Sequence, residues 1–225
     1  MCRQYISKER VKTRLKRRYG WLYAIAFALI LNLAVAGASR SYHLMEVRQD
    51  QTGKSVTLTS RIPRLSGLKD SSEQAKRNIE FQEESKKALV WTQMYRAKTG
   101  AQTASADQYY EVSFADENCL SIVFQTNFSA SGANAQWKQG HTIRLSDGKP
   151  LLFSDLFEQD SGYQRVVEKM IQQALQDPSF QLSPRQSYYL TQQDLVVLVG
   201  SVSNFSQKEV ALARDQLQGY LKQEF

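Results

Sequence analysis

The sequence predicts an α+β fold in which an N-terminal transmembrane or signal helix precedes a mostly antiparallel sheet packed with two or three helices. Three observations support this fold class. A strongly basic segment leads directly into the apolar run 21–38, as in a membrane-targeting leader. Several later segments alternate apolar and polar residues with the period of two that is typical of strands. Single segments with helical periodicity separate these strands, and short turns join neighbouring strands, which favours antiparallel pairing.

The start of the chain predicts a membrane anchor. Residues 1–20 carry eight basic side chains and one acidic side chain, so the rest of the chain holds 21 of each and is neutral. In the run 21–38, Asn32 is the only strongly polar side chain. A helix of this length spans about 27 Å, close to the roughly 30 Å of a bilayer's hydrocarbon core. Because basic flanks stay in the cytoplasm, we expect a basic cytoplasmic tail at 1–20 and a membrane contact through 21–38. The protein would then be a single-pass protein of the cell membrane with an extracytoplasmic C-terminal domain.

The end of the apolar run leaves a second outcome open. Its last residues are small, and cleavage near Ala36 or Ala38 would fit the small-x-small pattern of signal peptides and give a secreted protein. Residues 39–54 are polar and have no periodicity, which predicts a stalk. Residues 55–225 suffice for one ordinary domain with its own core, and we expect them to form the extracytoplasmic α+β domain.

The domain is predicted to begin with a strand and a long helix. Apolar and polar residues alternate over 56–62, and Pro63 ends the predicted strand. Ser71 is followed three residues later by Gln74, which is a capping-box pattern. The pattern predicts a helix that continues to about Arg96 and that is largely solvated along its sparsely apolar middle.

Two strands and two loops are predicted next. Residues 97–107 are rich in Gly, Ala, Thr and Ser and predict a loop. Alternation over 109–114 and over 120–128 predicts two strands, which a turn at 116–118 joins into a hairpin. Residues 129–134 predict a further loop.

The second half predicts more strands and two more helices. A strand at 141–145 turns at Asp147-Gly148 toward 151–153, and an amphipathic helix follows at 161–176 with Ser161 and Gln164 at its start. The last elements are a hairpin of 187–191 with 195–199, a short strand near 209–211, and a C-terminal helix with inward-facing residues between 213 and 221. Because residues 195–199 are apolar on both faces, we expect their strand to be central.

The sequence contains no readable active site. The only histidines are His43, in the predicted stalk, and His141, in a predicted strand, and neither stands in a zinc-binding spacing. We therefore expect no enzyme, no catalytic residue, no metal site and no cofactor. The alternative is a cell-envelope hydrolase, which would need His141, Asp147 and Asp155 to converge in one cleft. Because the excess positive charge lies in the N-terminal tail, we expect no nucleic-acid partner.

Neighbouring tyrosines are candidate ligand contacts. Tyr188 and Tyr189 are adjacent in a predicted strand, so one should face the core and the other the surface. Exposed strand tyrosines can bind protein or sugar, because they combine an apolar ring with a polar tip.

Several stretches of the chain resemble the RsiV-like extracytoplasmic domain. These stretches are Gly132-Ala-Asn-Ala135, Thr142-Ile-Arg-Leu145 with Ser-Asp-Gly148-Lys149-Pro-Leu151, Asp155-Leu156-Phe157, Tyr188-Tyr189-Leu190-Thr191, and Ile62-Pro63 upstream. The resemblance covers roughly residues 55–223. This domain occurs in anti-sigma factors that sense lysozyme and beside the catalytic domain of some peptidoglycan deacetylases.

The resemblance implies a non-enzymatic bacterial sensor or ligand-binding protein of the cell envelope. Its partner would be a lysozyme-like protein or peptidoglycan. The loop 131–136, with Gly132 and Asn134, and the pair Tyr188 and Tyr189 are the expected contacts. Two alternatives remain open: a hydrolase or deacetylase-accessory protein of the envelope, and an anti-sigma factor with an unusually short cytoplasmic tail.

Overall fold

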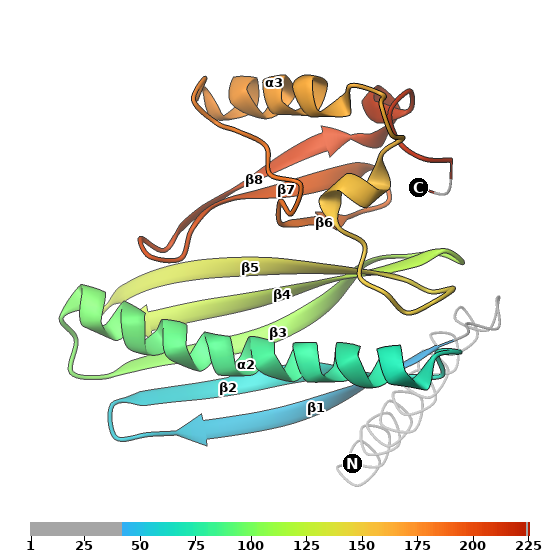
Figure 1. The fold of residues 1–225 in the computed structure, drawn as a ribbon. Helices are drawn as coiled ribbons and strands as arrows, with labels where there is room; N and C mark the ends of the chain where they lie inside the picture. Colours follow the sequence, from blue (N-terminus) through green and yellow to red (C-terminus); the bar gives the residue numbers. More distant parts are fainter. Residues whose placement is uncertain (1–41, 224) are drawn as a thin grey trace, which may run out of the picture. The chain divides into compact units, whose positions relative to one another are not determined.

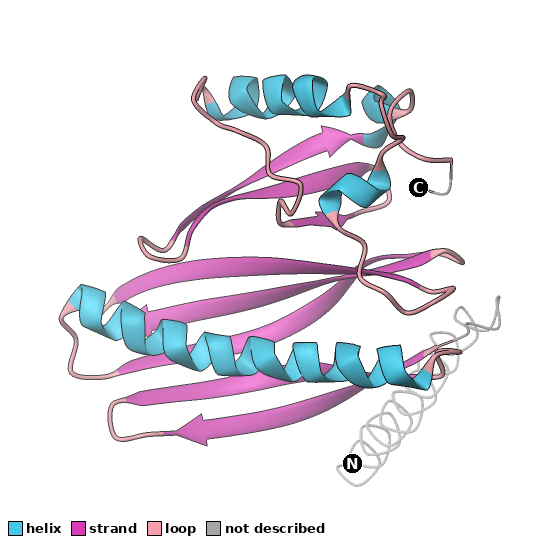
Figure 2. Cartoon of the chain, in the orientation of Figure 1, coloured by secondary structure: helices cyan, strands magenta, loops and turns pink. Residues whose placement is uncertain are grey.

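The computed structural model describes residues 42–223 and residue 225, which form two β-sheets and two α-helices (Figures 1 and 2). The predicted cytoplasmic tail and apolar run lie outside the described residues. Within the described part of the chain, no helix is both long and apolar enough to cross a membrane. The predicted α+β class is confirmed for this part of the chain.

The larger sheet has five strands in the order β1-β2-β3-β4-β5. Their bounds are His43–Thr52 for β1, Val56–Ser66 for β2, Ala104–Ala115 for β3, Cys119–Ala130 for β4 and Ala133–Arg144 for β5. All neighbours pair antiparallel except β2 and β3, which are parallel. A parallel pair needs a crossover connection, and helix α2 (Ser71–Thr99) supplies it and lies along one face of the sheet (Figure 1).

Strand β1 corrects the prediction of a stalk at 39–54. Residues 43–52 pair with β2 along their whole length, as in the pairs Val47 with Ile62 and Gln49 with Ser60. The folded domain therefore begins before residue 55. The sequence conceals this strand because β1 is an edge strand with mostly polar, partly exposed side chains, so it carries no apolar alternation.

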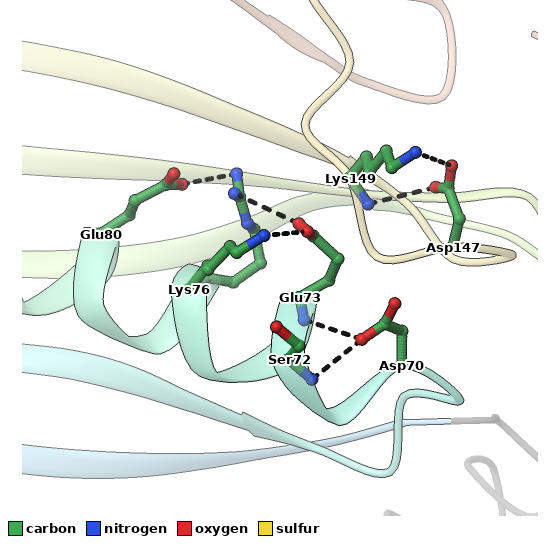
Figure 3. A network of polar contacts seen from close by, with 8 residues as sticks. Asp70, Ser72, Glu73, Lys76, Glu80, Asp147 and Lys149 are labelled. Atoms are coloured by element: carbon green, nitrogen blue, oxygen red, sulfur yellow. Dashed lines mark hydrogen bonds and ion pairs between the residues drawn. The ribbon is translucent and has the colours of Figure 1, made fainter.

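Helix α2 begins one residue earlier than its predicted cap suggests. Asp70, and not Ser71, is the N-cap: its carboxylate accepts hydrogen bonds from the backbone N–H groups of Ser72 (2.9 Å) and Glu73 (3.0 Å), as Figure 3 shows. The helix ends at Gly100, whose left-handed conformation (φ 66°) is the usual C-terminal stop.

A polar belt crosses the interface between α2 and the sheet. Ser85 Oγ donates to Ser60 Oγ (2.9 Å), and Ser60 Oγ donates to Gln108 Oε1 (3.2 Å). Gln108 Nε2 donates to the carbonyl oxygen of Glu84 (3.2 Å) and to Thr126 Oγ1 (3.3 Å). The belt separates two apolar clusters, one containing Phe81, Leu120, Ile122 and Phe124, the other Ala88, Tyr95, Phe128 and Trp137.

The second sheet has three antiparallel strands in the order β6-β7-β8. They are Tyr188–Leu190, Asp194–Ser201 and Ser206–Ala213. The prediction of a central strand at 195–199 is confirmed. Helix α3 (Tyr163–Leu175) packs on this sheet through Val167 and Ile171. The predicted C-terminal helix is wrong: only the 3₁₀ turn Arg214–Leu217 forms there, followed by an isolated bridge at Leu221.

The small sheet is fastened to the large sheet at strand β5. Gly140 makes the close approach possible, because a Cβ atom at this position would lie 1.7 Å from the carbonyl oxygen of Tyr188 in β6. The side chain of Gln207 in β8 accepts from Lys138 N (2.8 Å) and donates to Lys138 O (2.9 Å). Leu190 N donates to Ser121 Oγ in β4 (3.0 Å). The small sheet thus covers one end of the large sheet's face and leaves the other end open.

Candidate functional site

The open end of the large sheet carries an ordered set of polar side chains. Side chains at alternate positions of β2, β3, β4 and β5 point to the face opposite α2, and eight of them line a shallow hollow of about 780 Å³. We call these eight residues the polar platform: Thr57, Thr59, Ser105, Asp107, Asn127, Ser129, Asn134 and Gln136.

The strand register arranges the polar platform in two rows that cross four strands. The first row contains Thr57, Ser105, Ser129 and Asn134, and the second contains Thr59, Asp107, Asn127 and Gln136. Neighbours within a row are separated by about 4.8 Å, the distance between strands, and the rows by about 6.7 Å, two residues along a strand. The platform therefore presents hydroxyl and amide groups at regular intervals in two directions.

Hydrogen bonds within the platform orient its amides. Asn127 Oδ1 accepts from Gln136 Nε2 (3.1 Å) and from Gln125 Nε2 (3.2 Å). Because the amide oxygen of Asn127 is engaged in this way, its NH₂ group is the end that can donate to a ligand.

The polar platform is electrically balanced. Asp107 is its only charged member, and Arg61 beside it pairs with Asp107 Oδ2 at 3.2 Å. The Arg61 guanidinium also lies 5.7 Å from the ring centroid of Tyr109, the next aromatic residue on this face. The surface therefore has many hydrogen-bonding groups and little net charge.

The structure brings one predicted contact into the platform and places a second at its margin. Asn134 belongs to the first row. Gly132 lies in the β4–β5 turn, where Ser131 and Gly132 both have positive φ (49° and 80°) and form a two-residue hairpin. The predicted loops 129–134 and 131–136 are thus mostly strand, and the tight turn keeps Asn134 in register with Ser129.

The two tyrosines lie in the small sheet, on opposite faces as predicted. Tyr188 is buried, and its hydroxyl donates to Leu151 O (2.9 Å). Tyr189 is half-buried, and its hydroxyl donates to Glu209 Oε2 (2.6 Å). Burial raises the pKa of both hydroxyls, so each stays a neutral donor. Of the pair, Tyr189 is the one that a ligand at the surface could reach.

A second polar cluster lies on the other face of β5, against α2. His141 Nε2 lies 3.2 Å from Glu84 Oε1, and Lys87 Nζ lies 2.8 Å from the same oxygen. The Glu84 side chain is 1% exposed. Burial acts to raise the pKa of this carboxyl, but His141 and Lys87 together outweigh burial and hold the pKa below its ordinary value.

The residues required by the hydrolase alternative have separate partners. Asp147 Oδ1 accepts from the backbone N–H of Lys149 (3.1 Å, Figure 3), and Asp155 Oδ2 accepts from that of Leu152 (2.9 Å). His141 contacts Glu84 instead. The described residues also contain no group of three His, Cys, Asp or Glu side chains that could hold a metal ion.

The platform was not found by sequence reasoning, although its signal was present. The outward residues of each strand could be read from the alternation, as in Asn127 and Ser129. The register that aligns these strands into rows depends on long-range pairing, which the alternation of a single strand does not encode.

Neither a protein-family model nor a curated protein sequence matches this chain. A solved structure of a DUF3298 family member from Bacteroides fragilis NCTC 9343 has a TM-score of 0.50 at 12% identity, covering 83% of this chain and 95% of that chain. A DUF3298 family protein from Pseudomonas aeruginosa PAO1 has a TM-score of 0.49 at 14% identity, covering 83% of this chain and 96% of that chain. The first similarity shows a shared fold.

Proposed function

We propose that this chain is a non-enzymatic ligand-binding protein of the bacterial cell envelope, anchored by residues 21–38, and that its outer domain binds its ligand on the polar platform. The observation that carries this proposal is the pair of polar rows at the end of the sheet face that the small sheet leaves open. The resemblance to RsiV-like domains supports the extracytoplasmic location.

The chemistry of the platform favours a neutral ligand rich in hydroxyl groups. Its side chains are hydroxyls and amides, which can both donate and accept, and its one carboxylate is already paired with Arg61. A nucleic acid would need a surplus of cations on this face, and an apolar partner would need an apolar patch. We therefore favour the glycan strands of peptidoglycan as the ligand.

The regular spacing supports an extended ligand rather than a single small molecule. Each row crosses four strands, and two rows run side by side, so a chain lying across the sheet would meet a new pair of polar groups at every strand. Many weak hydrogen bonds, each worth about 1 kcal/mol net, would add up to specific binding.

The test uses the full chain, solubilised in detergent, and insoluble purified peptidoglycan in a sedimentation assay. Asn127→Leu combined with Gln136→Leu keeps the side-chain size but removes two polar groups of the second row. We expect retention to weaken about tenfold or more, since each lost hydrogen bond costs about 1 kcal/mol. Gln192→Leu, an exposed substitution in the turn before β7, is the matched control and should leave retention unchanged.

Two results would contradict the proposal. One is the absence of retention on peptidoglycan by the wild-type chain. The other is equal retention by the platform variant and the control. If the wild-type chain instead captures lysozyme and the platform variant does not, the platform binds a protein, and the glycan ligand is wrong.

A further inference from the structure

Strand β1 is an open edge of the large sheet. Among the described residues, β2 is its only strand neighbour, and the two strands pair without a break in register from His43 to Thr52. The edge strand on the other side, β5, instead contacts β6 and β8 of the small sheet. Proline and bulges are two features that keep an edge strand from pairing further, and β1 has neither. Its outer backbone groups can therefore pair with another strand.

The β1–β2 turn determines which residues of β1 direct their backbone outward. Gly53 N donates to Val56 O (2.8 Å), so these two residues form a hydrogen-bonded pair. Hydrogen-bonded pairs alternate with non-hydrogen-bonded pairs along an antiparallel ladder. By the register of β1 and β2, odd-numbered residues of β1 bond to β2, and even-numbered residues turn their N–H and C=O groups away from it. A further strand must therefore bond to the even-numbered residues, which are Leu44, Glu46, Arg48, Asp50 and Thr52.

The charges of β1 are complementary to those of the same strand running in the opposite direction. Glu46 and Arg48 stand on either side of Val47. When Val47 lies opposite Val47 of a second copy, each Glu46 lies opposite Arg48 of the other copy, which gives two ion pairs about a two-fold axis. Glu46 is exposed and has no ion pair among the described residues, whereas Arg48 Nε contacts Asp50 Oδ2 at 3.1 Å.

Other registers match these charges less well. If Arg48 lies on the axis, the two arginines face each other and Glu46 faces Asp50, so all these contacts are between like charges. If Gln49 lies on the axis, Arg48 faces Asp50, with which it is already paired in its own chain, and Glu46 faces Thr52. The register centred on Val47 is the one that places Glu46 opposite a cation.

The same register covers an exposed apolar side chain. Odd-numbered side chains of β1 lie on the α2 side of the sheet, as the hydrogen bond from Gln51 Nε2 to Ser85 Oγ (3.3 Å) shows. Met45 belongs to this set and is 60% exposed. With Val47 on the axis, Met45 lies diagonally across from Val47 of the second copy, within reach of a long side chain. Met45 and Val47 of both copies then form one apolar strip.

We propose that β1 pairs antiparallel with β1 of a second copy of this chain, with Val47 on the two-fold axis, so that the two large sheets become one continuous sheet. Because each copy uses the same edge, the assembly closes at two chains. The two-fold axis of an antiparallel strand pair is perpendicular to the sheet, so both polar platforms lie on the same face of the dimer. This pairing does not depend on what the polar platform binds.

The first test places a cysteine on the proposed axis, in the full chain in detergent micelles. The chain has two cysteines, of which Cys2→Ser removes one and Cys119 is buried. Val47 would face its copy in a non-hydrogen-bonded pair, where Cβ atoms lie about 4.5–5.5 Å apart, close to the separation in a disulfide. In the Cys2→Ser background, we expect Val47→Cys to form a disulfide-linked dimer under mild oxidation, measured by non-reducing electrophoresis.

Gln49→Cys is the matched control for this cross-link. It lies on the same strand and the same face, but in the proposed register it is opposite Met45, and the two introduced cysteines are about 13 Å apart along the strands. We expect it to cross-link at least about fivefold less than Val47→Cys.

The second test changes the charges. Glu46→Arg places like charges opposite each other on both sides of the axis, so the dissociation constant of the dimer, measured by analytical ultracentrifugation, should rise about tenfold. Combining Glu46→Arg with Arg48→Glu exchanges the two charges and should restore most of the association. Glu117→Arg, at an exposed position in the β3–β4 turn, makes the same change of net charge and should leave the association unchanged.

Three outcomes would overturn the proposal. They are cross-linking of Val47→Cys that does not exceed that of Gln49→Cys, a dissociation constant that does not change in Glu46→Arg, and a double charge variant that associates no better than Glu46→Arg alone. Peptidoglycan retention is measured separately, so a monomeric chain that still binds peptidoglycan would contradict the pairing of β1 and leave the proposed function standing.

Discussion

The two faces of strand β5 carry side chains with different surroundings, and single residues account for the difference. Gly140 lets β6 approach the strand closely, and Gln139 and His141 lie on the α2 side of the strand while Gln136 faces the polar platform. The sequence shows the alternation but not the partners. Glu84, in particular, reads as part of a solvated charge run on a helix, yet it is buried and its carboxylate lies 3.2 Å from His141 Nε2.

The buried Glu84 predicts a pH dependence of stability. Its pKa is lower in the folded chain than the ordinary value of 4.5, so its ionised form stabilises the fold above that pH. This contribution is lost as pH falls through the folded-state pKa. We expect the free energy of unfolding, measured by chemical denaturation, to fall below about pH 4.5. In Glu84→Gln, this fall should be smaller, and stability at pH 7 should be lower by about 1–3 kcal/mol.

Glu83→Gln is the matched control for this prediction. Glu83 forms the same type of contact with Lys86, three residues along the helix, but both side chains are largely exposed. An exposed pair contributes about 0–1 kcal/mol, so this variant should behave like the wild type. Equal acid sensitivity in all three proteins would contradict the role given to Glu84.

Gly140 predicts a strong steric effect. A methyl group there would lie 1.7 Å from Tyr188 O, so Gly140→Ala must push β6 away from β5. We expect a loss of about 3 kcal/mol in the free energy of unfolding, measured by urea denaturation. Gly219→Ala, where a Cβ atom would meet nothing within 4 Å, should cost little. If both variants lose a similar free energy of unfolding, the close approach of β6 is not the reason that position 140 needs glycine.

At the scale of elements, the long helix and the strands with apolar alternation were predictable, and the polar edge strand was not. The helix was expected at 71–96 and lies at Ser71–Thr99, because length and capping residues are local signals. The predicted loop at 97–107 overlaps β3, whose first residues are small and polar because they belong partly to the platform. Strand β1 was missed because only one of its edges is paired, so pattern alone could not separate it from a stalk.

The helix cap provides a direct test of structure against sequence. Asp70 accepts two backbone hydrogen bonds, whereas the sequence pattern assigned the cap to Ser71. Asp70→Ala should lower the free energy of unfolding by about 1 kcal/mol, and Ser71→Ala should have almost no effect. Thermal unfolding followed by circular dichroism measures both effects. A larger loss of stability in Ser71→Ala than in Asp70→Ala would show that Ser71 is the N-cap, as the sequence pattern predicted.

At the scale of the whole molecule, the class of fold was predictable and its division into two sheets was not. Antiparallel hairpins such as β3–β4 follow from neighbouring strands and a turn. The separation of β6–β8 from the larger sheet depends on the close approach at Gly140 and on the side chain of Gln207, both of which act over long sequence distances. The polar platform lies at the end of the large sheet that this second sheet leaves open.

The proposed anchoring is also a prediction for the intact molecule. In bacteria, the full chain should remain in the membrane fraction after alkaline washing, and added protease should digest its outer domain in intact spheroplasts. Mass spectrometry of the N-terminus then separates the anchored form from a form cleaved near Ala36 or Ala38. Recovery of the intact, protease-protected chain in the cytosol would contradict the proposed location.

The carboxamide of Gln207 affects whether two copies of the protein can associate through the edge of β5. It occupies both the N–H and the C=O of Lys138 on the outer rim of β5. An incoming strand from another chain would need these same groups to extend the sheet. The Gln207 side chain therefore blocks sheet growth at this point, so that a crowded layer of these molecules is protected here against edge-to-edge aggregation.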